Sequence, residues 1–418
     1  MAEAIHADVA VIGGGVIGLG IAHQARKLGH SVALIDPAPA TGATFAAAGM
    51  LAPVSELHYQ EEDLLELMLE SWRLWPSFVD ELPQGGEASG YRTTPTLAVG
   101  ADAADRRALA DLRTVQLAAG LAVEPLSLRA ARDREPLLSP QISCAFDIPA
   151  DHQVDPRKLA GHLLAGLGAH SPGDSTWVSG ASGGFAVRKS ASGLRWEGDR
   201  VSGVELESGG TVLARETVVA NGLEAPRLAG LPEGLDLPVR PVYGDILRLQ
   251  VPAHLQPLLT ATVRGIVRGV PVYIVPRGDG TVVIGATQRE DGLSATSNAV
   301  SAGGVYQLLR DAQVLVPAVA ELELLEATAR ARPGTPDNAP LLGRVGNPAG
   351  GPAGEVEGLV IATGFFRHGV LLTPVAARIV GELLAGSPDS RWSIFRPDRF
   401  SATRSHFRPM ETPAGSHQ

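Results

Sequence analysis

The sequence predicts a mixed α/β fold with more than one domain. The chain opens with a strand, a tight turn, a helix and a second strand, which is the pattern of a parallel βαβ unit. Residues 242–288 instead have a β-type pattern, with apolar and polar residues alternating at 242–249. A length of 418 residues and a hydrophobic content of 44% allow two domains and a sizeable core.

The opening βαβ unit spans residues 8–36. Residues 8–13 form a short apolar run that favours a strand, and residues 30–36 form the second one. Between them, apolar residues at helical spacing and a glycine suited to a C-cap predict a helix: Ile17, Ile21, Ala25, Leu28 and Gly29.

Three further helices are predicted in the first half of the chain. Apolar spacing indicates one over residues 64–75, which we expect Pro76 to kink or end. Its tryptophans at 72 and 75 are expected in the core. Another helix is expected over residues 104–119, and Gly120 breaks it. The Asp-Pro pair at 155–156 starts a third helix, because Asp caps free N–H groups and Pro suits the first helical position.

The second half of the chain has mainly strand signals. Two strand-like pieces lie in residues 201–220, around a Ser-Gly-Gly turn at 208–210. A hairpin is predicted from residues 273–277 and 281–287, with Asp279-Gly280 as its turn.

The C-terminal region is predicted to contain one more strand and one more helix. Residues 358–363 have the pattern of a buried strand, and a helix is expected over residues 371–384 after a glycine-rich turn. Residues 401–418 lack periodicity, so we expect a disordered tail.

Gly13, Gly15 and Gly18 form a G-x-G-x-x-G motif between the first strand and its helix. In a Rossmann-like fold the first glycine makes the turn, the second lets the backbone approach a pyrophosphate, and the third lets the helix lie close to the strand. Asp36 ends the second strand, where a carboxylate can bind an adenosine ribose and would repel a 2′-phosphate. The motif disfavours NADP but leaves NAD and FAD open; a glycine-rich turn without a ligand is the alternative.

Composition excludes several other classes of protein. A formal charge of −10 argues against nucleic acid as a partner. The single cysteine, Cys144, permits no internal disulfide. Residues 9–22 are too short and glycine-rich for a signal peptide or membrane span, so we expect a cytoplasmic protein without membrane contact. His58, His152 and His368 show no metal-binding spacing, and no metal is expected.

Further segments beyond the glycine motif are distinctive, and they are Gly-Ala-Thr-Phe-Ala-Ala-Ala-Gly-Met-Leu-Ala-Pro at 42–53, Arg-Pro-Val-Tyr-Gly-Asp at 240–245, Tyr-Ile-Val-Pro-Arg at 273–277, Gly-Ala-Thr at 285–287, Arg-Pro-Gly-Thr-Pro-Asp at 332–337, Thr-Gly at 363–364 and Arg-His-Gly at 367–369. In sequence and in order, between about residues 7 and 390, they resemble glycine oxidases of the thiamine pathway, within the D-amino-acid oxidase superfamily. The Ala-Ala-Ala-Gly-Met-Leu stretch favours the glycine oxidase branch over D-amino-acid dehydrogenases.

The resemblance implies FAD, held non-covalently because Cys144 is far from the segment where related enzymes attach flavin. It also implies a discontinuous FAD-binding domain made of residues 1–85, 150–225 and 325–400. A mostly antiparallel substrate-binding domain would comprise residues 86–149 and 226–324. Oligomeric state is left open, with a homo-oligomer as one option.

The family's site residues map onto three positions here. By resemblance, Arg332 clamps the substrate carboxylate, a task that suits the two-pronged guanidinium, and Tyr273 adds a second contact. Arg367 lines the substrate site. The alternatives are a surface arginine before a turn and a tyrosine filling the core. A two-residue hairpin turn would place Tyr273 opposite Ala286, with Gln288 as a diagonal neighbour on the same face. A three-residue loop would place Ala286 and Gln288 on the opposite face from Tyr273.

Residues expected to line the substrate pocket are Met50, Gln288 and Arg330. Backbone N–H groups near position 369 are expected to face the flavin and stabilise its anionic reduced ring. The complete set of expected cofactor-binding residues is Gly13, Gly15, Val16, Ile17, Gly18, Asp36, Thr44, Ala47, Ala48, Gly49, Met50, Val178, Gly222, Arg332, Gly364, Arg367, His368, Gly369, Val370 and Leu371.

Three positions depart from the family pattern around this pocket. Gln288 stands at a usually apolar position, Arg330 replaces a glycine, and His368 falls in Phe-Arg-His-Gly where relatives often have Tyr-Arg-Asn-Gly. The sequence therefore predicts FAD-dependent oxidation of glycine, sarcosine or a small D-amino acid by O2, with the exact amine open. A dehydrogenase that uses another electron acceptor, and a catalytically silent flavin-binding protein, are the alternatives.

Overall fold

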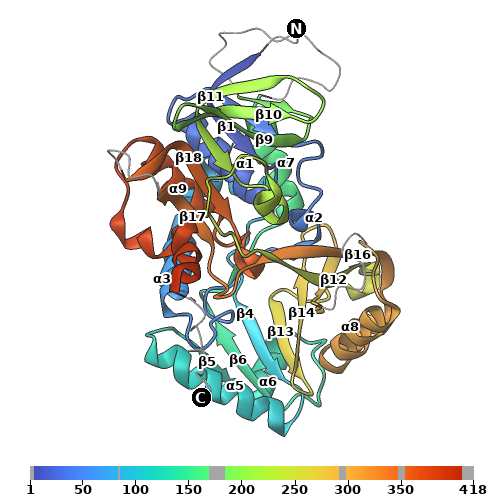
Figure 1. The fold of residues 1–418 in the computed structure, drawn as a ribbon. Helices are drawn as coiled ribbons and strands as arrows, with labels where there is room; N and C mark the ends of the chain where they lie inside the picture. Colours follow the sequence, from blue (N-terminus) through green and yellow to red (C-terminus); the bar gives the residue numbers. More distant parts are fainter. Residues whose placement is uncertain (1–3, 83–84, 169–183, 291–297, 347–353, 407–418) are drawn as a thin grey trace, which may run out of the picture.

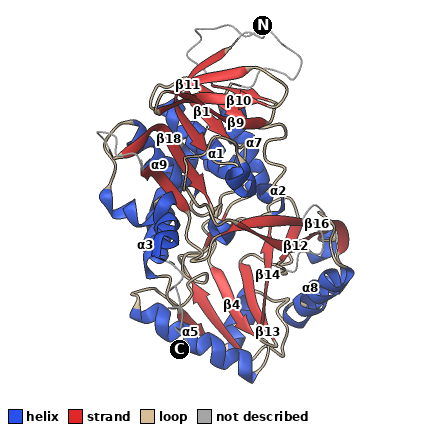
Figure 2. Cartoon of the chain, in the orientation of Figure 1, coloured by secondary structure: helices blue, strands red, loops and turns tan. Residues whose placement is uncertain are grey.

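The computed structural model describes residues 4–82, 85–168, 184–290, 298–346 and 354–406. Their strands form two large sheets, one above the other in Figure 1, and one small two-stranded sheet. Helices pack against both large sheets (Figure 2). The mixed α/β fold predicted from the sequence is confirmed.

The first sheet is parallel at its centre and has the strand order β17-β18-β10-β11-β1-β2-β8, with β9 paired to β10. β1 runs parallel to both β2 and β11, and β11 runs parallel to β18. Its strands are β1 (Ile5–Ile12), β2 (Val32–Ile35), β8 (Gly184–Val187), β9 (Ala191–Glu197), β10 (Arg200–Leu206), β11 (Thr211–Val219), β17 (Leu341–Gly346) and β18 (Glu355–Thr363). The predicted βαβ unit, the strand pair within 201–220 and the strand near 358–363 are all present.

Four helices cover one face of this sheet, where Val9 and Val11 of β1 point. They are α1 (Val16–Lys27), α3 (Glu62–Asp80), α7 (Pro156–Gly166) and α9 (Thr373–Leu384). Ala10 and Ile12 face the other side and pack into a separate apolar cluster with residues of β9 and β10. Asp155 caps α7 through the N–H groups of Arg157 and Lys158, as expected from the Asp-Pro pair.

The second sheet is mostly antiparallel, with the order β16-β12-β15-β14-β13-β4-β6-β5. Only its β4–β13 pair is parallel among the pairings described. Its strands are β4 (Thr96–Gly100), β5 (Glu124–Leu126), β6 (Cys144–Ile148), β12 (Arg240–Gln250), β13 (Thr262–Val267), β14 (Val270–Pro276), β15 (Thr281–Gly285) and β16 (Glu323–Gly334). Helix α8 (Ala302–Leu315) packs on one face, and α5 (Ala103–Ala118) packs on the other against β4 and β13.

Short elements complete the described chain. The small sheet pairs β3 (Met50–Leu51) with β7 (His152–Gln153). The remaining helices are α2 (Ala43–Ala46), α4 (Gly85–Ala88), α6 (Leu128–Arg134), η1 (Gly222–Arg227), η2 (Ala253–Leu255), η3 (Pro317–Glu321), η4 (Phe366–His368), η5 (Ser390–Phe395) and η6 (Pro397–His406).

Two local predictions can be compared with the structure, namely that Pro76 kinks or ends its helix and that residues 401–418 form a disordered tail. Pro76 does not end its helix, since α3 continues to Asp80. Phe78 and Val79 follow the proline and are buried, and burying two such side chains at about 1.5–3 kcal/mol each offsets a proline cost of about 3 kcal/mol. The tail prediction is wrong for residues 401–406, which belong to η6; residues 407–418 lie outside the described chain.

The central hairpin is present and has a three-residue loop, one of the two turn lengths that the sequence left open. Tyr273 pairs with Gly285, and the N–H of Arg277 donates to the carbonyl of Thr281, leaving residues 278–280 as the loop. Tyr273 is therefore not opposite Ala286. The glycine matters here, because a Cβ at position 285 would clash with the Tyr273 hydroxyl.

The expected FAD-binding segments included residues 325–334, but the structure pairs these residues, as part of β16, with β12 in the second sheet. The long β12–β16 ladder crosses between the two halves in Figure 1. A strand in this position can carry side chains to the junction between the sheets. We retain the division into two domains as a proposal, with β16 at their boundary.

Close packing of α1 on β1 depends on the third glycine of the motif. A Cβ at Gly18 would overlap the carbonyl oxygen of Gly13. By contrast, a Cβ at Gly161 in α7 would meet no atom within 4 Å.

Gly18→Ala should lower the free energy of unfolding by about 1–3 kcal/mol, because the methyl group forces the helix away from the strand. The measurement is urea denaturation followed by tryptophan fluorescence. Gly161→Ala is the control, and it should stabilise the protein by about 0.5–1 kcal/mol through helix propensity. Equal effects of the two substitutions would contradict the packing argument.

Candidate active site

A single cavity of about 1130 Å³ extends between the two sheets. One end lies at the carboxyl ends of β1 and β2, where parallel α/β sheets commonly bind ligands. Its middle is bounded by the segment at 41–50, by the end of β16 and by the segment at 363–371. The other end lies under α5.

The glycine turn occupies the first end of the cavity. Gly13 has φ +107°, a conformation that disfavours other residues, and a Cβ there would meet the Ala220 carbonyl oxygen at 2.5 Å. The N–H groups of Gly15 and Ile17 find no acceptor among the hydrogen bonds of the described chain. Free N–H groups at the N-terminus of α1 suit a pyrophosphate. Gly18, in contrast, does not line the cavity and serves the packing described above.

Asp36 lines this end and orders the turn. Its carboxylate accepts hydrogen bonds from the N–H of Gly14 at 2.6 Å and from the N–H of Ala38 at 2.7 Å. Each carboxylate oxygen retains a further lone pair for a ribose hydroxyl.

Arginines hold the segment at 41–50 against the second sheet. Arg248 donates to the carbonyls of Phe45 and Ala47, and Arg157 donates to Phe45 at 2.8 Å. Buried Arg277 donates to Ala48, and burial lowers its pKa to about 10. The expected residues Thr44, Ala47, Ala48, Gly49 and Met50 line the cavity. Sequence reasoning assigned no role to these arginines, although Arg277 ends the motif at 273–277; the signal of Arg157 and Arg248 was only their basic residue type within a helix and a strand.

The segment before α9 presents further backbone donors. In the part of the chain that the structure describes, no hydrogen-bond acceptor is found for the N–H groups of Gly369, Val370 or Leu371. The Leu371 carbonyl is held by the Trp75 indole N–H at 2.9 Å and by the Ser71 hydroxyl. Trp75 is fully buried and does not line the cavity, as expected for a core residue.

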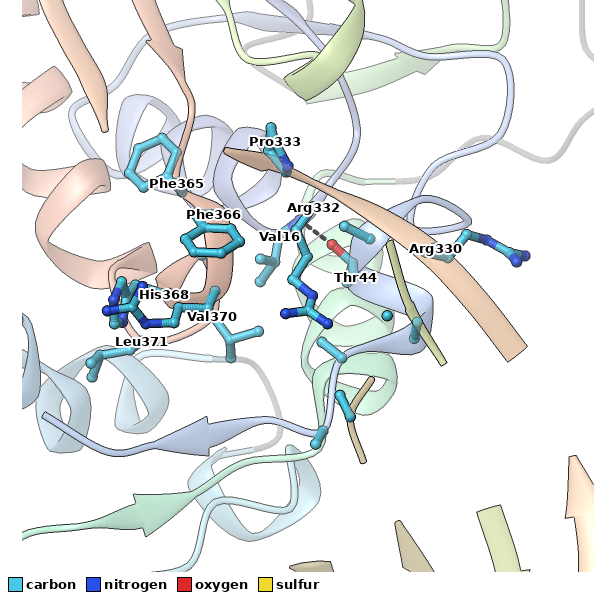
Figure 3. A pocket seen from close by; sticks show the side chains of 18 of the residues that line it. Val16, Thr44, Arg330, Arg332, Pro333, Phe365, Phe366, His368, Val370 and Leu371 are labelled. Carbon is cyan, nitrogen blue, oxygen red and sulfur yellow. Dashed lines mark hydrogen bonds between the residues drawn. The ribbon is translucent and has the colours of Figure 1, made fainter. Parts of the chain in front are cut away.

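Arg332 reaches from β16 into the middle of the cavity. Figure 3 shows its guanidinium between Thr44 and the segment that carries Val370. It donates to the Thr287 carbonyl at 3.0 Å, and no carboxylate of the described residues forms an ion pair with it. Burial lowers its pKa. Gly244 makes room, because a Cβ there would overlap the guanidinium.

Tyr273 lies on the same cavity wall. Burial raises its pKa to about 12, so its hydroxyl stays protonated near neutral pH. The described hydrogen bonds give this hydroxyl no partner, which leaves it available as a donor to a ligand.

Arg367 is also in the cavity, but its charge is already balanced. It donates to Glu56 at 3.1 Å and to Glu61 at 2.6 Å. Glu56 also forms an ion pair with Arg264 of β13. Burial opposes ionisation of Glu56, but the positive charges of Arg264, protonated His368 and Arg367 outweigh it and lower its pKa to about 2. Neither carboxylate nor Arg264 was predicted, since residues 56 and 61 lie in a polar stretch without periodicity.

The remaining predicted residues divide into two groups. Gln288 and Gly222 line the cavity, as do Val16, Gly364 and His368, whose ring is buried with Nε2 unpartnered. Arg330 belongs to the lining too, but its guanidinium points away from Arg332 in Figure 3 and donates to the Thr41 carbonyl.

Val178, an expected cofactor contact, lies outside the described residues. The described residues contain no group of three or more His, Cys, Asp or Glu side chains placed to hold a metal ion. None of their helices is long and apolar enough to cross a bilayer.

The model of the FAD dependent oxidoreductase family matches residues 8–383, nearly the whole chain. The chain belongs to this family. Its cofactor is therefore FAD, which decides between the two dinucleotides that the glycine motif had left open. The free N–H groups at both helix N-termini and the small-residue segment beside Arg332 fit the pyrophosphate and the ring of such a cofactor.

Two curated relatives support the resemblance to glycine oxidases. The chain is 32% identical to the glycine oxidase of Geobacillus kaustophilus (strain HTA426) over 405 residues, which cover 95% of this chain and 97% of that protein. It is 28% identical to the bifunctional protein ThiO/ThiG of Trichormus variabilis, covering 94% of this chain and 55% of that longer protein.

Among solved structures, the glycine oxidase from Geobacillus kaustophilus matches with a TM-score of 0.79 at 30% identity, covering 94% of this chain and 99% of that one. The predicted membership of the amino-acid oxidoreductases is confirmed.

Glu56→Gln should destabilise the protein by about 3 kcal/mol at pH 7, because it removes the charge between two buried arginines. The folded pKa of about 2 is below the ordinary value of 4.5. The stabilisation is therefore complete above about pH 4.5 and is lost as the pH falls toward 2. Urea denaturation at pH 7 and pH 3.5 measures this loss. The difference in the free energy of unfolding between the wild type and Glu56→Gln should be smaller at pH 3.5.

Glu66→Gln is the control for this experiment. Glu66 pairs with Arg391 at the surface, where an ion pair contributes about 0–1 kcal/mol. If Glu56→Gln lowered the free energy of unfolding at pH 7 no more than the control does, Glu56 would not stabilise the fold through its two buried arginines.

Proposed function

We propose that this FAD-dependent oxidoreductase oxidises the amine of glycine or a similar small amine, such as sarcosine or a small D-amino acid, with O2 as electron acceptor. The products would be hydrogen peroxide and an imine, which water converts to a 2-oxo acid and ammonia, or to a 2-oxo acid and methylamine when the substrate is sarcosine. By resemblance, the imine also serves assembly of the thiamine thiazole.

The observation that carries this proposal is the unpaired charge of Arg332. Two arginines and two glutamates of the neighbouring cluster balance each other: Arg264 and Arg367 against Glu56 and Glu61. Arg332 then supplies one net positive charge in the middle of the cavity. Such a site complements a single carboxylate, which a guanidinium binds through both oxygens.

The protein's part in the reaction is positioning and charge stabilisation. Bound FAD supplies the acceptor of the hydride that leaves the substrate Cα. Arg332 would hold the carboxylate, and the protonated Tyr273 hydroxyl would donate a second hydrogen bond to it. The free N–H groups of Gly369 to Leu371 would stabilise negative charge that develops on the reduced ring.

The proposal keeps FAD non-covalent and the protein cytoplasmic. In support of the first, Cys144 is the chain's single cysteine, is buried in β6 and does not line the cavity. A quinone-dependent dehydrogenase remains the alternative within the same chemistry.

The test is anaerobic mixing of the purified protein with glycine, sarcosine, D-alanine and D-proline, followed by air. We expect loss of the flavin absorbance with at least one of these amines, then recovery in air with formation of peroxide. Reduction with slow recovery in air would indicate the dehydrogenase. A flavin that stays oxidised with every amine would indicate a silent flavin-binding protein.

Arg332→Ala should reduce kcat/KM for glycine by the equivalent of about 2–5 kcal/mol, because the substrate carboxylate loses its buried partner. The flavin spectrum should be unchanged. Arg330→Ala is the matched control on the same strand, and it should change kcat/KM much less, since its guanidinium binds the Thr41 carbonyl. Equal losses in the two variants would remove Arg332 from the substrate site.

A further inference from the structure

The cavity continues beyond the proposed reaction site into a region under α5 that oxidation of glycine would not use. We call it the α5 compartment. It is lined by Ala98, Leu109, Leu112, Gln116, Val123, Phe146, Ile148 and Ile266.

The second sheet connects this compartment directly to Tyr273. Tyr273 pairs with Arg264, Arg264 with Ala98, and Ala98 with Phe146. Paired residues of neighbouring strands project from the same face of a sheet. At about 4.8 Å per strand, Ala98 lies about 10 Å from Tyr273 along the sheet and Phe146 about 14 Å. One face of one sheet therefore carries both the reaction site and the compartment.

Helix α5 forms the opposite wall. Leu109 is buried, Leu112 is half-buried, and both line the cavity. The mouth lies nearby, because Tyr59 and Ala108 line the same cavity and are exposed to solvent.

The compartment offers an apolar surface with no free charge. Its one amide, Gln116, donates to the Val54 carbonyl at 2.9 Å. Arg264, at the boundary with the reaction site, is paired with Glu56. A charged or strongly polar group placed there would lose its hydration without gaining a partner, whereas an alkyl group would lose nothing by leaving water.

We propose that the substrate of this site is an amino acid that carries an apolar substituent on its nitrogen or Cα, and that this substituent lies in the α5 compartment. This inference rests on the proposed function, since it requires the carboxylate to be bound by Arg332. Oxidation removes a hydride from Cα and a proton from nitrogen. Water then adds to the imine, and the products are a 2-oxo acid and the amine or ammonia that leaves.

The test is kcat/KM of the purified holoenzyme for two series. One runs from glycine through sarcosine to N-propyl-, N-butyl- and N-pentylglycine; the other runs from D-alanine to D-norleucine. Once the substituent is long enough to extend past Arg264 into the compartment, each added methylene should raise kcat/KM about fourfold in at least one series. This is the value expected for burying one CH₂ group. N-(3-carboxypropyl)glycine, which ends in a carboxylate, should show no such gain.

A variant that fills the compartment gives an independent measurement. Leu112→Trp should lower the ratio of kcat/KM for N-pentylglycine to that for glycine at least tenfold. Leu117→Trp is the control, because Leu117 is an exposed residue of the same helix that does not line the cavity. It should leave the ratio unchanged. Flavin content confirms that each variant is folded.

Failure of the inference and failure of the proposed function are separable. If glycine or sarcosine reduces the flavin but kcat/KM is flat or falls with chain length in both series, the inference is wrong and the proposed function stands. If no member of either series reduces the flavin, both are wrong.

Discussion

The unpaired guanidinium of Arg332 is the feature on which the rest of the site depends. A buried cation is costly unless something compensates it, and here the fold supplies only the Thr287 carbonyl and, nearby, a neutral Tyr273 hydroxyl. Gly244 leaves space for the guanidinium. Glu56 forms ion pairs with Arg264 and Arg367 and is therefore not available to Arg332. The protein therefore retains a site whose charge is completed by an anionic ligand, at some cost to its own stability.

Backbone groups perform much of the remaining binding. Free N–H groups precede both α1 and α9, so two helix N-termini face the same cavity from the first sheet. Between them, the chain at 41–50 is held in place by arginines that bind its carbonyls. The guanidiniums of these arginines are therefore directed at backbone carbonyls of the segment, whereas the Arg332 guanidinium reaches into the middle of the cavity.

The second sheet determines how large a ligand the site can take. Its face carries a tyrosine and a paired arginine at one end and only small or apolar residues at the other. The three residues that depart from the family pattern all line the cavity, and they differ in what they contact. Gln288 lines the cavity, His368 is buried against it, and the Arg330 guanidinium turns toward Thr41. In the proposed function, substrate identity would therefore depend more on the α5 compartment than on Arg330.

The sequence by itself determined the βαβ unit, the glycine-rich turn, most limits of the five helices that it predicted and the family, because these depend on residues within a few positions of one another or on ordered motifs. The ordered motifs also singled out Arg332 and Tyr273, which both line the cavity and which we propose as the substrate contacts. Tertiary structure alone decided which charges cancel: Glu56 meets Arg264 across 208 positions and Arg367 across 311. It also decided the three-residue hairpin loop that pairs Tyr273 with Gly285, the continuation of α3 through Pro76 and the compartment under α5. Each of these depends on packing between distant segments, for which local spacing holds no information.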